Sequence, residues 1–167
     1  MKKIIIPLLL VVILSFFILG CDNDEPEFVT NVFTATFFTD LSSFAEDPQC
    51  TAPQNFLNVQ QGNGSETTVG NFTTTLAFCV NPATFEYSNS MSSFLASNGD
   101  ELFLDYGGQV VPTTKAGYDL EFKDPFTITG GTGRFEDATG SGTTDSYVNM
   151  TTGRTDHIWN GTIRLKK

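Results

Sequence analysis

Residues 125–142 read PFTITGGTGRFEDATGSG, and this stretch is the strongest indication of fold in the chain. Phe126 and Ile128 are two residues apart, so they would share one face of a strand. The glycine-dense segment 130–133 follows, and clustered glycines mark a tight turn or a close approach of two backbones. The stretch therefore predicts a strand that ends in a tight corner, with Phe135 placed to close the interior beyond it.

The spacing of this corner resembles the glycine-rich hairpin of the allene oxide cyclase and dirigent-like barrels, in which a G-x-G-x-F-x-x-A-x-G pattern lies late in the chain. Five residues stand at the positions of that pattern: Gly131, Gly133, Phe135, Ala138 and Gly140. The resemblance implies an antiparallel barrel whose interior holds side chains or one small ligand. A phosphate-binding loop does not fit, because the P-loop spacing is absent and Glu136 stands where a dinucleotide loop needs its third glycine.

The composition beyond residue 20 is typical of an all-β domain. Fourteen of the sixteen phenylalanines lie there, threonine, serine, asparagine and glycine are abundant, and no useful segment has the apolar period of a helix. Turn signals separate about eight to ten short segments, which is typical of a closed barrel or a sandwich. Together with the resemblance, this pattern favours an antiparallel, approximately eight-stranded barrel over a sandwich.

Several strands and turns can be placed from the sequence. Residues 28–38 alternate as a first strand, and residues 41–54 contain prolines and are expected to form a loop. Residues 62–64 are expected to turn the chain. Asn98-Gly99 is typical of a type I′ hairpin turn, in which both central residues have a positive φ. Residues 28–167 would then form a single domain of ordinary size.

The first twenty-one residues are typical of an export signal that ends at a lipid attachment site. Two lysines precede an apolar run that is shorter than the ~20 residues of a membrane-spanning helix. The end of the run resembles the lipobox of bacterial lipoproteins, although Leu19 is larger than the usual residue. The resemblance implies a signal helix over 1–20, cleavage before Cys21, a diacyl group on its sulfur and a chain such as palmitate on its amino group. The alternative is an uncleaved membrane anchor.

The segment after Cys21 is acidic, lacks apolar residues and contains a proline, so residues 21–27 predict a solvated tether. Two or more acyl chains on Cys21 would hold the protein stably at a membrane. Acidic residues directly after a lipidated cysteine resemble the surface-export signal of some Gram-negative lipoproteins, which favours the outer membrane and exposure at the cell surface. In other bacteria Asp22 would resemble an inner-membrane retention mark, so both locations stay open.

The charge balance bears on the expected partners. Removal of residues 1–20 would leave seven basic and nineteen acidic residues, a formal net charge of −12. Nucleic acids and anionic lipid surfaces attract cationic proteins, so neither is expected to bind the domain. The expected partners are the membrane, through the acyl chains of Cys21, and a small apolar ligand or a cell-surface protein.

Cys50 and Cys79 remain once Cys21 is assigned to lipid. Export to an oxidising compartment favours a disulfide between them, which would close a loop of about 30 residues. The bridge would tie the loop at 41–54 to a strand that ends near residue 80. A catalytic thiol is disfavoured, because no histidine accompanies either cysteine.

The chain offers few residues for catalysis. His157 is the only histidine, and no set of histidine, cysteine and carboxylate residues has the spacing of a metal site. No G-x-S-x-G nucleophile motif is present. His157 is expected to be a polar residue near the start of the last strand, and carboxylates such as Glu66 are expected to be solvated surface charges. No catalytic residue, metal or cofactor is therefore predicted.

Four aromatic residues are candidates for lining a ligand cavity, with a filled core as the alternative: Tyr106, Phe126, Phe135 and Trp159. The favoured function is that of an exported, membrane-anchored lipoprotein, not an enzyme, that binds a small apolar molecule or a partner protein. One alternative is an isomerase or cyclase that acts in an apolar barrel cavity, by analogy with the plant barrels. The other is a structural component of a cell-surface assembly.

Overall fold

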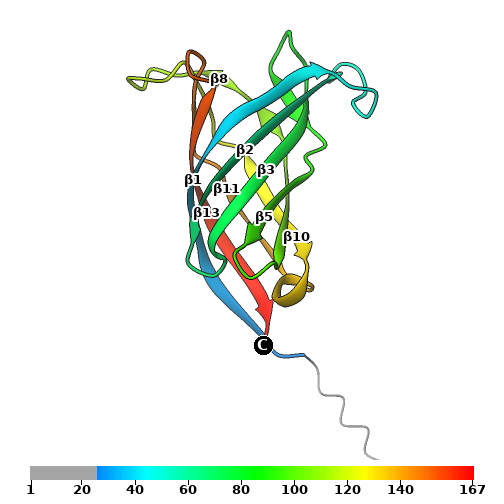
Figure 1. Ribbon diagram of the computed structural model, residues 1–167, viewed down its shortest axis with the longest axis vertical. Coiled ribbons are helices and arrows are strands. Elements are labelled where there is room, and N and C mark those ends of the chain that lie inside the picture. The colour runs from blue at the N-terminus through cyan, green and yellow to red at the C-terminus, as the bar shows by residue number, and fades with distance from the viewer. Residues whose placement is uncertain (1–25) are drawn as a thin grey trace, which may run out of the picture.

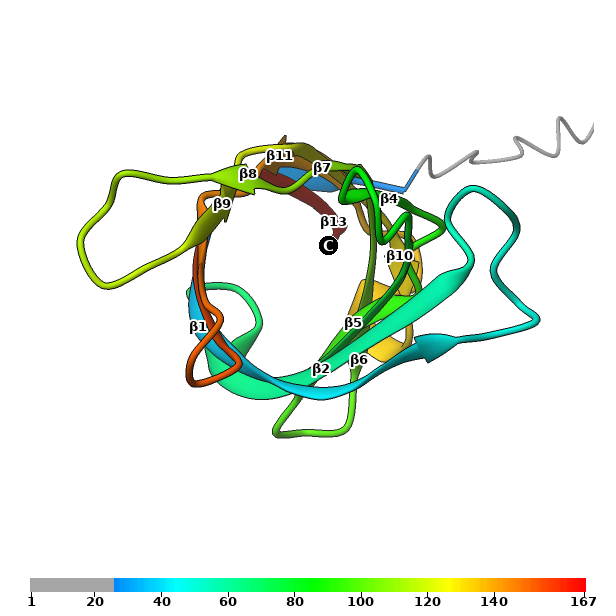
Figure 2. The ribbon, with the colours of Figure 1, turned by 90° about the horizontal axis from the view of Figure 1, so that it is seen from above.

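The computed structural model describes residues 26–167, so the signal helix, Cys21 and most of the tether lie outside the described residues. The described chain is a closed antiparallel barrel of eight strands (Figure 1), and Figure 2 shows these strands as a complete ring. In order around the ring they are β1 (Phe28–Glu46), β2 (Phe56–Glu66), β3 (Gly70–Val80), β5 (Ser92–Ala96), β6 (Glu101–Tyr106), β10 (Pro125–Gly131), β11 (Thr139–Thr143) and β13 (Arg154–Lys166), which pairs with β1. The predicted all-β barrel is confirmed. Within residues 26–167, no helix has the length and apolar character required to cross a bilayer.

Short strands lengthen the walls at one end of the barrel. They are β4 (Glu86–Ser88), β7 (Gly108–Gln109), β8 (Val111–Pro112), β9 (Leu120–Phe122) and β12 (Ser146–Asn149). Phe122 lies opposite Ser146, and Pro125 lies opposite Thr143, so β9 and β12 keep the register that β10 and β11 establish. β11 and β12 also keep one register along β13. The short strands therefore continue the barrel walls past local irregularities.

Alternate residues of the strands fill the interior. On β1, Phe33 and Phe37 are buried, whereas Thr34 between them faces solvent. The rings contact one another directly: those of Phe72 and Phe94 stack with centroids 4.0 Å apart. The largest fully buried side chains include Trp159, Phe33, Phe94, Phe126 and Phe135. The phenylalanine-rich composition thus supplies the core, as expected.

The glycine-dense corner closes the lower end of the barrel in Figure 1. β10 ends at Gly131, and one turn of 3-10 helix, η1 (Gly133–Phe135), follows. Gly133 has a φ of +55°, which a residue without a Cβ adopts at no steric cost. Phe135 is completely buried, and Nη2 of Arg134 donates to the carbonyl oxygen of Val69 at 2.7 Å. The predicted strand, corner and interior phenylalanine are confirmed, and Arg134 ties the corner to the turn between β2 and β3.

Both ends of the described chain lie at this sealed end. Phe28 pairs with Lys166, and the backbone N–H of Lys167 donates to the carbonyl oxygen of Glu27 at 2.8 Å. In Figure 1 the connections between β1 and β2 and between β8 and β9 project from the opposite end. The chain therefore enters the barrel from the sealed end, and its long loops surround the other end.

Two expected loops differ in the structure. β1 continues to Glu46, because residues 41–46 pair with the start of β2 after a bulge between Leu41 and Ser43. The expected loop at 41–54 is thus shorter. The hairpin at Asn98 is present, but only Gly99, at +91°, has a positive φ, so the turn is not type I′.

The prediction of a turn at residues 62–64 was wrong. These residues lie inside β2, and the chain reverses between Glu66 and Gly70. A Cβ added to Gly64 would lie 2.2 Å from the Cβ of Phe37 on β1. Gly64 lets β1 and β2 approach each other closely. Glycine marks turns at other positions of this protein, but at this position it marks closely paired strands.

The predicted disulfide is confirmed. Cys50, in the loop between β1 and β2, is bonded to Cys79 near the end of β3, with their Cα atoms 5.5 Å apart. Both cysteines are buried. The bridge holds the loop against the wall at the open end of the barrel.

Removal of this bridge should destabilise the barrel. The double variant Cys50→Ala/Cys79→Ala frees a closed loop with a sequence separation of 29 residues. On the chain-entropy model, its free energy of unfolding should fall by about 3–4 kcal/mol, measured by guanidinium denaturation. Reduction of the wild-type protein should produce a similar loss, and a loss below about 1 kcal/mol in both experiments would contradict the expectation.

Candidate ligand cavity

A cavity of about 210 Å³ lies at the end of the barrel opposite the sealed corner. Most of its lining is apolar, from Leu41, Phe44, Phe78, Val80, Phe85, Val110, Leu120, Phe122, Val148 and Met150. The remaining lining residues are Asn58, Gln60, Gly153 and Thr155, so the described residues that line the cavity include no charged side chain. An apolar cavity of ~150 Å³ can hold benzene, so a space of this size suits a small organic molecule.

The rim of the cavity exposes apolar side chains to solvent. They are Leu41 (48% exposed), Phe44 (42%), Phe85 (40%) and Met150 (62%). Phe85 has a φ of +57°, which is rare for a bulky residue. Its backbone is held on both sides, since its N–H donates to Asn81 at 2.8 Å and its carbonyl accepts from Val110 at 3.1 Å. Strained backbone of this kind gathers at binding sites, and here it places an aromatic ring at the entrance.

Two carboxamides of β2 interrupt the apolar lining. Asn58 and Gln60 are two residues apart, so their side chains leave the same face of the strand. The side-chain oxygen of Asn58 is buried and has no hydrogen-bond partner among the described residues. An unpaired buried acceptor costs about 1–3 kcal/mol, a cost that a donor on a bound molecule would remove.

Gln60 ends a buried hydrogen-bond chain that runs from the core to the cavity. The indole N–H of Trp159 donates to Oγ of Ser146 at 3.1 Å, and this oxygen lies 2.8 Å from Nδ1 of His157. On the other side of the ring, Nε2 of His157 lies 2.9 Å from Oγ1 of Thr39, whose hydroxyl donates to Oε1 of Gln60 at 2.5 Å. All five side chains are buried.

One arrangement of the hydrogens gives every donor from Trp159 to Thr39 an acceptor. Ser146 accepts the N–H of Trp159, so its own hydroxyl hydrogen needs an acceptor, and Nδ1 of His157 is the one in reach among the described residues. The imidazole then carries its proton on Nε2 and donates to Thr39. Thr39 in turn donates to Oε1 of Gln60, which leaves the amide nitrogen of Gln60 available at the cavity surface.

His157 lies on β13 as expected, but in the interior. Its ring stacks on Phe37 with centroids 4.2 Å apart and planes 11° apart. Burial disfavours the charged imidazolium and lowers the pKa of His157 to about 3. The residue does not line the cavity, so its neutral ring serves the hydrogen-bond chain.

The four aromatic candidates for the cavity lie in the packed core instead of along this cavity. Trp159 lies 5.3 Å from Phe126 and 5.1 Å from Tyr106, measured between ring centroids. The hydroxyl of Tyr106 lies 2.9 Å from Oγ of Ser92, and burial raises the pKa of Tyr106. Phe135 fills the sealed end. These rings pack against one another and fill this part of the interior, so the cavity begins only above them.

Glu66 was expected on the surface and is buried instead. Its carboxylate accepts the backbone N–H groups of Thr68 and Val69 at 2.6 and 2.8 Å, so it stabilises the turn between β2 and β3. Within residues 26–167, no group of three or more histidine, cysteine, aspartate or glutamate side chains is arranged to hold a metal ion.

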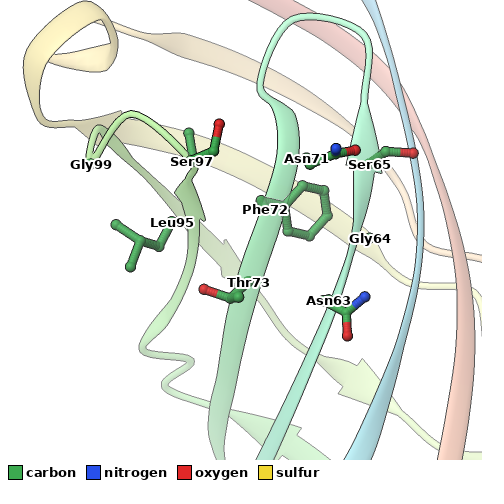
Figure 3. A pocket seen from close by; sticks show the side chains of 10 residues that line it. Asn63, Gly64, Ser65, Asn71, Phe72, Thr73, Leu95, Ser97 and Gly99 are labelled. Carbon is green, nitrogen blue, oxygen red and sulfur yellow. The ribbon is translucent and has the colours of Figure 1, made fainter.

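A larger hollow of about 800 Å³ lies on the outer wall over β2, β3 and β5. Figure 3 shows short polar side chains along it, among them Asn63, Asn71 and Thr73. These side chains are exposed, and the hollow is a shallow groove. It offers less burial for an apolar ligand than the cavity at the barrel end, which is therefore the stronger candidate site.

Comparison with solved structures supports the fold. The pterocarpan synthase dirigent protein GePTS1 matches with a TM-score of 0.60 and 15% identity, over 85% of this chain and 93% of that one. The pterocarpan synthase dirigent protein PsPTS1 matches with a TM-score of 0.56 and 15% identity, over 84% and 97%. A pyocyanin demethylase matches with a TM-score of 0.46 and 14% identity, over 83% and 98%. No protein-family model and no curated protein matches the sequence. The chain therefore has a dirigent-like barrel fold.

Because His157 is the only histidine in the sequence, its NMR signal tests the buried hydrogen-bond chain directly. The Cε1–H resonance of His157 should not titrate in ¹H NMR between pH 8 and 5, because its pKa is lowered to about 3. In the unfolded chain the imidazole takes up a proton near pH 6.5, so the free energy of unfolding should lose about 1.4 kcal/mol per pH unit from 6.5 toward 3.

The variant His157→Gln removes this titrating group and should lack that share of the acid sensitivity. If the His157 resonance of the folded wild-type protein titrates near pH 6.5, the ring is solvated and the buried hydrogen-bond chain is absent.

Proposed function

We propose that this protein is an exported lipoprotein whose barrel binds a small apolar ligand in the cavity at its open end. The observation that carries the proposal is the apolar cavity with an exposed aromatic and aliphatic rim, in a barrel whose other end is filled by buried aromatic side chains. Apolar pockets with a few placed polar groups are the usual form of small-molecule sites.

The position of the tether supports the proposal. The chain enters the barrel beside Lys167, at the sealed end, and the rim residues Phe44 and Phe85 lie at the opposite end. Acyl chains on Cys21 would place the sealed end toward the membrane and the cavity mouth away from it. The mouth would then face the aqueous compartment from which a ligand arrives, and we favour the surface of the outer membrane for it.

The lining favours binding over catalysis. An acid–base reaction needs a titratable group within hydrogen-bond reach of the substrate, and the lining residues are apolar or neutral. The nearest titratable ring of the polar chain, His157, is separated from Gln60 by Thr39. Retention of a ligand against water, through apolar burial, is the task that this surface performs best.

A matched pair of tryptophan variants tests the site. Val148 lines the cavity and Val32 is 74% exposed on the outer wall, so Val148→Trp fills the cavity while Val32→Trp makes the same change outside it. Naphthalene should bind the wild-type protein and Val32→Trp equally. It should bind Val148→Trp at least about tenfold more weakly, measured from naphthalene fluorescence.

Thermal unfolding and near-UV circular dichroism establish that both variants are folded. Absence of saturable naphthalene binding to the wild-type protein, or equal binding to both variants, would refute the cavity as the ligand site. Native mass spectrometry of the protein after incubation with a lipid extract would then show whether a ligand binds elsewhere.

A second experiment addresses the anchor. The mature wild-type protein should begin at Cys21, carry acyl chains and sediment with membranes, as measured by intact-mass spectrometry and cell fractionation. Cys21→Ser should abolish the added mass and the membrane association. A mature amino terminus elsewhere, or an unmodified Cys21, would contradict lipid anchoring without affecting the cavity proposal.

A further inference from the structure

The polar groups of the cavity define the chemistry of its ligand more narrowly than apolar lining alone. Asn58 contributes a buried acceptor without a partner among the described residues. Gln60 contributes its amide nitrogen as a hydrogen-bond donor, because its side-chain oxygen already accepts the hydroxyl hydrogen of Thr39. Both carboxamides belong to residues that line the cavity, at adjacent inward positions of β2, so one acceptor and one donor lie in its wall.

A hydroxyl group is the smallest group that matches this pair, since it donates one hydrogen and accepts through its lone pairs. Inward positions of a strand are about 7 Å apart, so the ends of the two carboxamides can reach a single oxygen atom between them. The rest of the cavity would hold an apolar body. Among residues 26–167, no charged side chain lines the cavity, so an ionised group on the ligand would be buried there without a counter-charge.

We infer that the ligand is a neutral, mostly apolar molecule with a single hydroxyl group, which donates to Asn58 and accepts from Gln60. The inference rests on the proposed binding function and adds the polar contact that would select among apolar ligands. The buried chain from Trp159 to Thr39 then has a role in recognition, because it holds the oxygen of Gln60 and orients its nitrogen toward the ligand.

The test uses three probes of one shape: naphthalene, 2-naphthol and 2-naphthoate. The wild-type protein should bind 2-naphthol about tenfold more tightly than naphthalene, because the hydroxyl satisfies the buried acceptor of Asn58. It should bind 2-naphthoate more weakly than either. Binding can be followed by the fluorescence of each probe at a pH where 2-naphthol is neutral.

Variants with matched controls on the same strand identify the contacts. Asn58→Leu should abolish the preference of the protein for 2-naphthol over naphthalene. Gln60→Met should reduce the affinity for 2-naphthol by about threefold and shift the NMR resonance of His157 through Thr39. Asn63→Leu and Gln61→Met make the same changes at exposed outer positions and should alter neither affinity.

The outcomes separate this inference from the proposed function. Equal binding of naphthalene and 2-naphthol to the wild-type protein would overturn the role of the hydroxyl while supporting an apolar site. Equal loss of both probes in Asn58→Leu would assign Asn58 to structure and overturn its role in recognition. Tightest binding of 2-naphthoate would overturn the neutral ligand, and binding of none of the probes would overturn the proposed function as well.

Discussion

The pairing of β1 with β13 is the interaction on which the rest of this protein depends. It joins Phe28 to Lys166 and continues to the pair of Asp40 with Arg154, so the two ends of the described chain form adjacent strands. This pairing leaves no free edge among the eight strands of the described barrel, and a closed sheet shields its interior from water around its whole circumference. Only within such an enclosure can a phenylalanine-rich core, a neutral histidine and an apolar cavity coexist in one small domain.

The interior divides into two parts at the level of His157. Below it, aromatic rings pack against one another down to Phe135, and the glycine corner seals the end. Above it, Phe78 and Phe122 give way to a cavity with an exposed rim. The hydrogen-bond chain lies at this boundary, where a side chain that points inward has rings on one side and open space on the other. Hydrogen bonds in such a place rigidify the side chains that they join, and the bond from Thr39 holds Gln60 in one orientation.

Much of the barrel could be predicted from local pattern. Alternation predicted the first strand over residues 28–38, and the glycine corner predicted both a strand end and the interior phenylalanine after it, Phe135. The ends of the strands were harder to predict, because glycine occurs both in turns and where two strands pair closely. Gly64 lies inside β2, where it pairs closely with β1. The burial of Glu66 also escaped prediction, since its carboxylate accepts the backbone N–H groups of Thr68 and Val69, a contact that exists only once the turn has formed.

The sequence by itself determined the all-β class, the sealed corner, the disulfide of Cys50 with Cys79 and the expectation of a lipid anchor, because each depends on residues close together or on chemistry that few residue types possess. Only the tertiary structure decided where the cavity lies and what lines it. Asn58, Phe122 and Val148 are far apart along the chain, and their shared position follows from strand register around the closed ring. The same closure placed Tyr106, Phe126 and Trp159 within reach of one another, and their rings filled the space that a sequence alone could equally have assigned to a ligand.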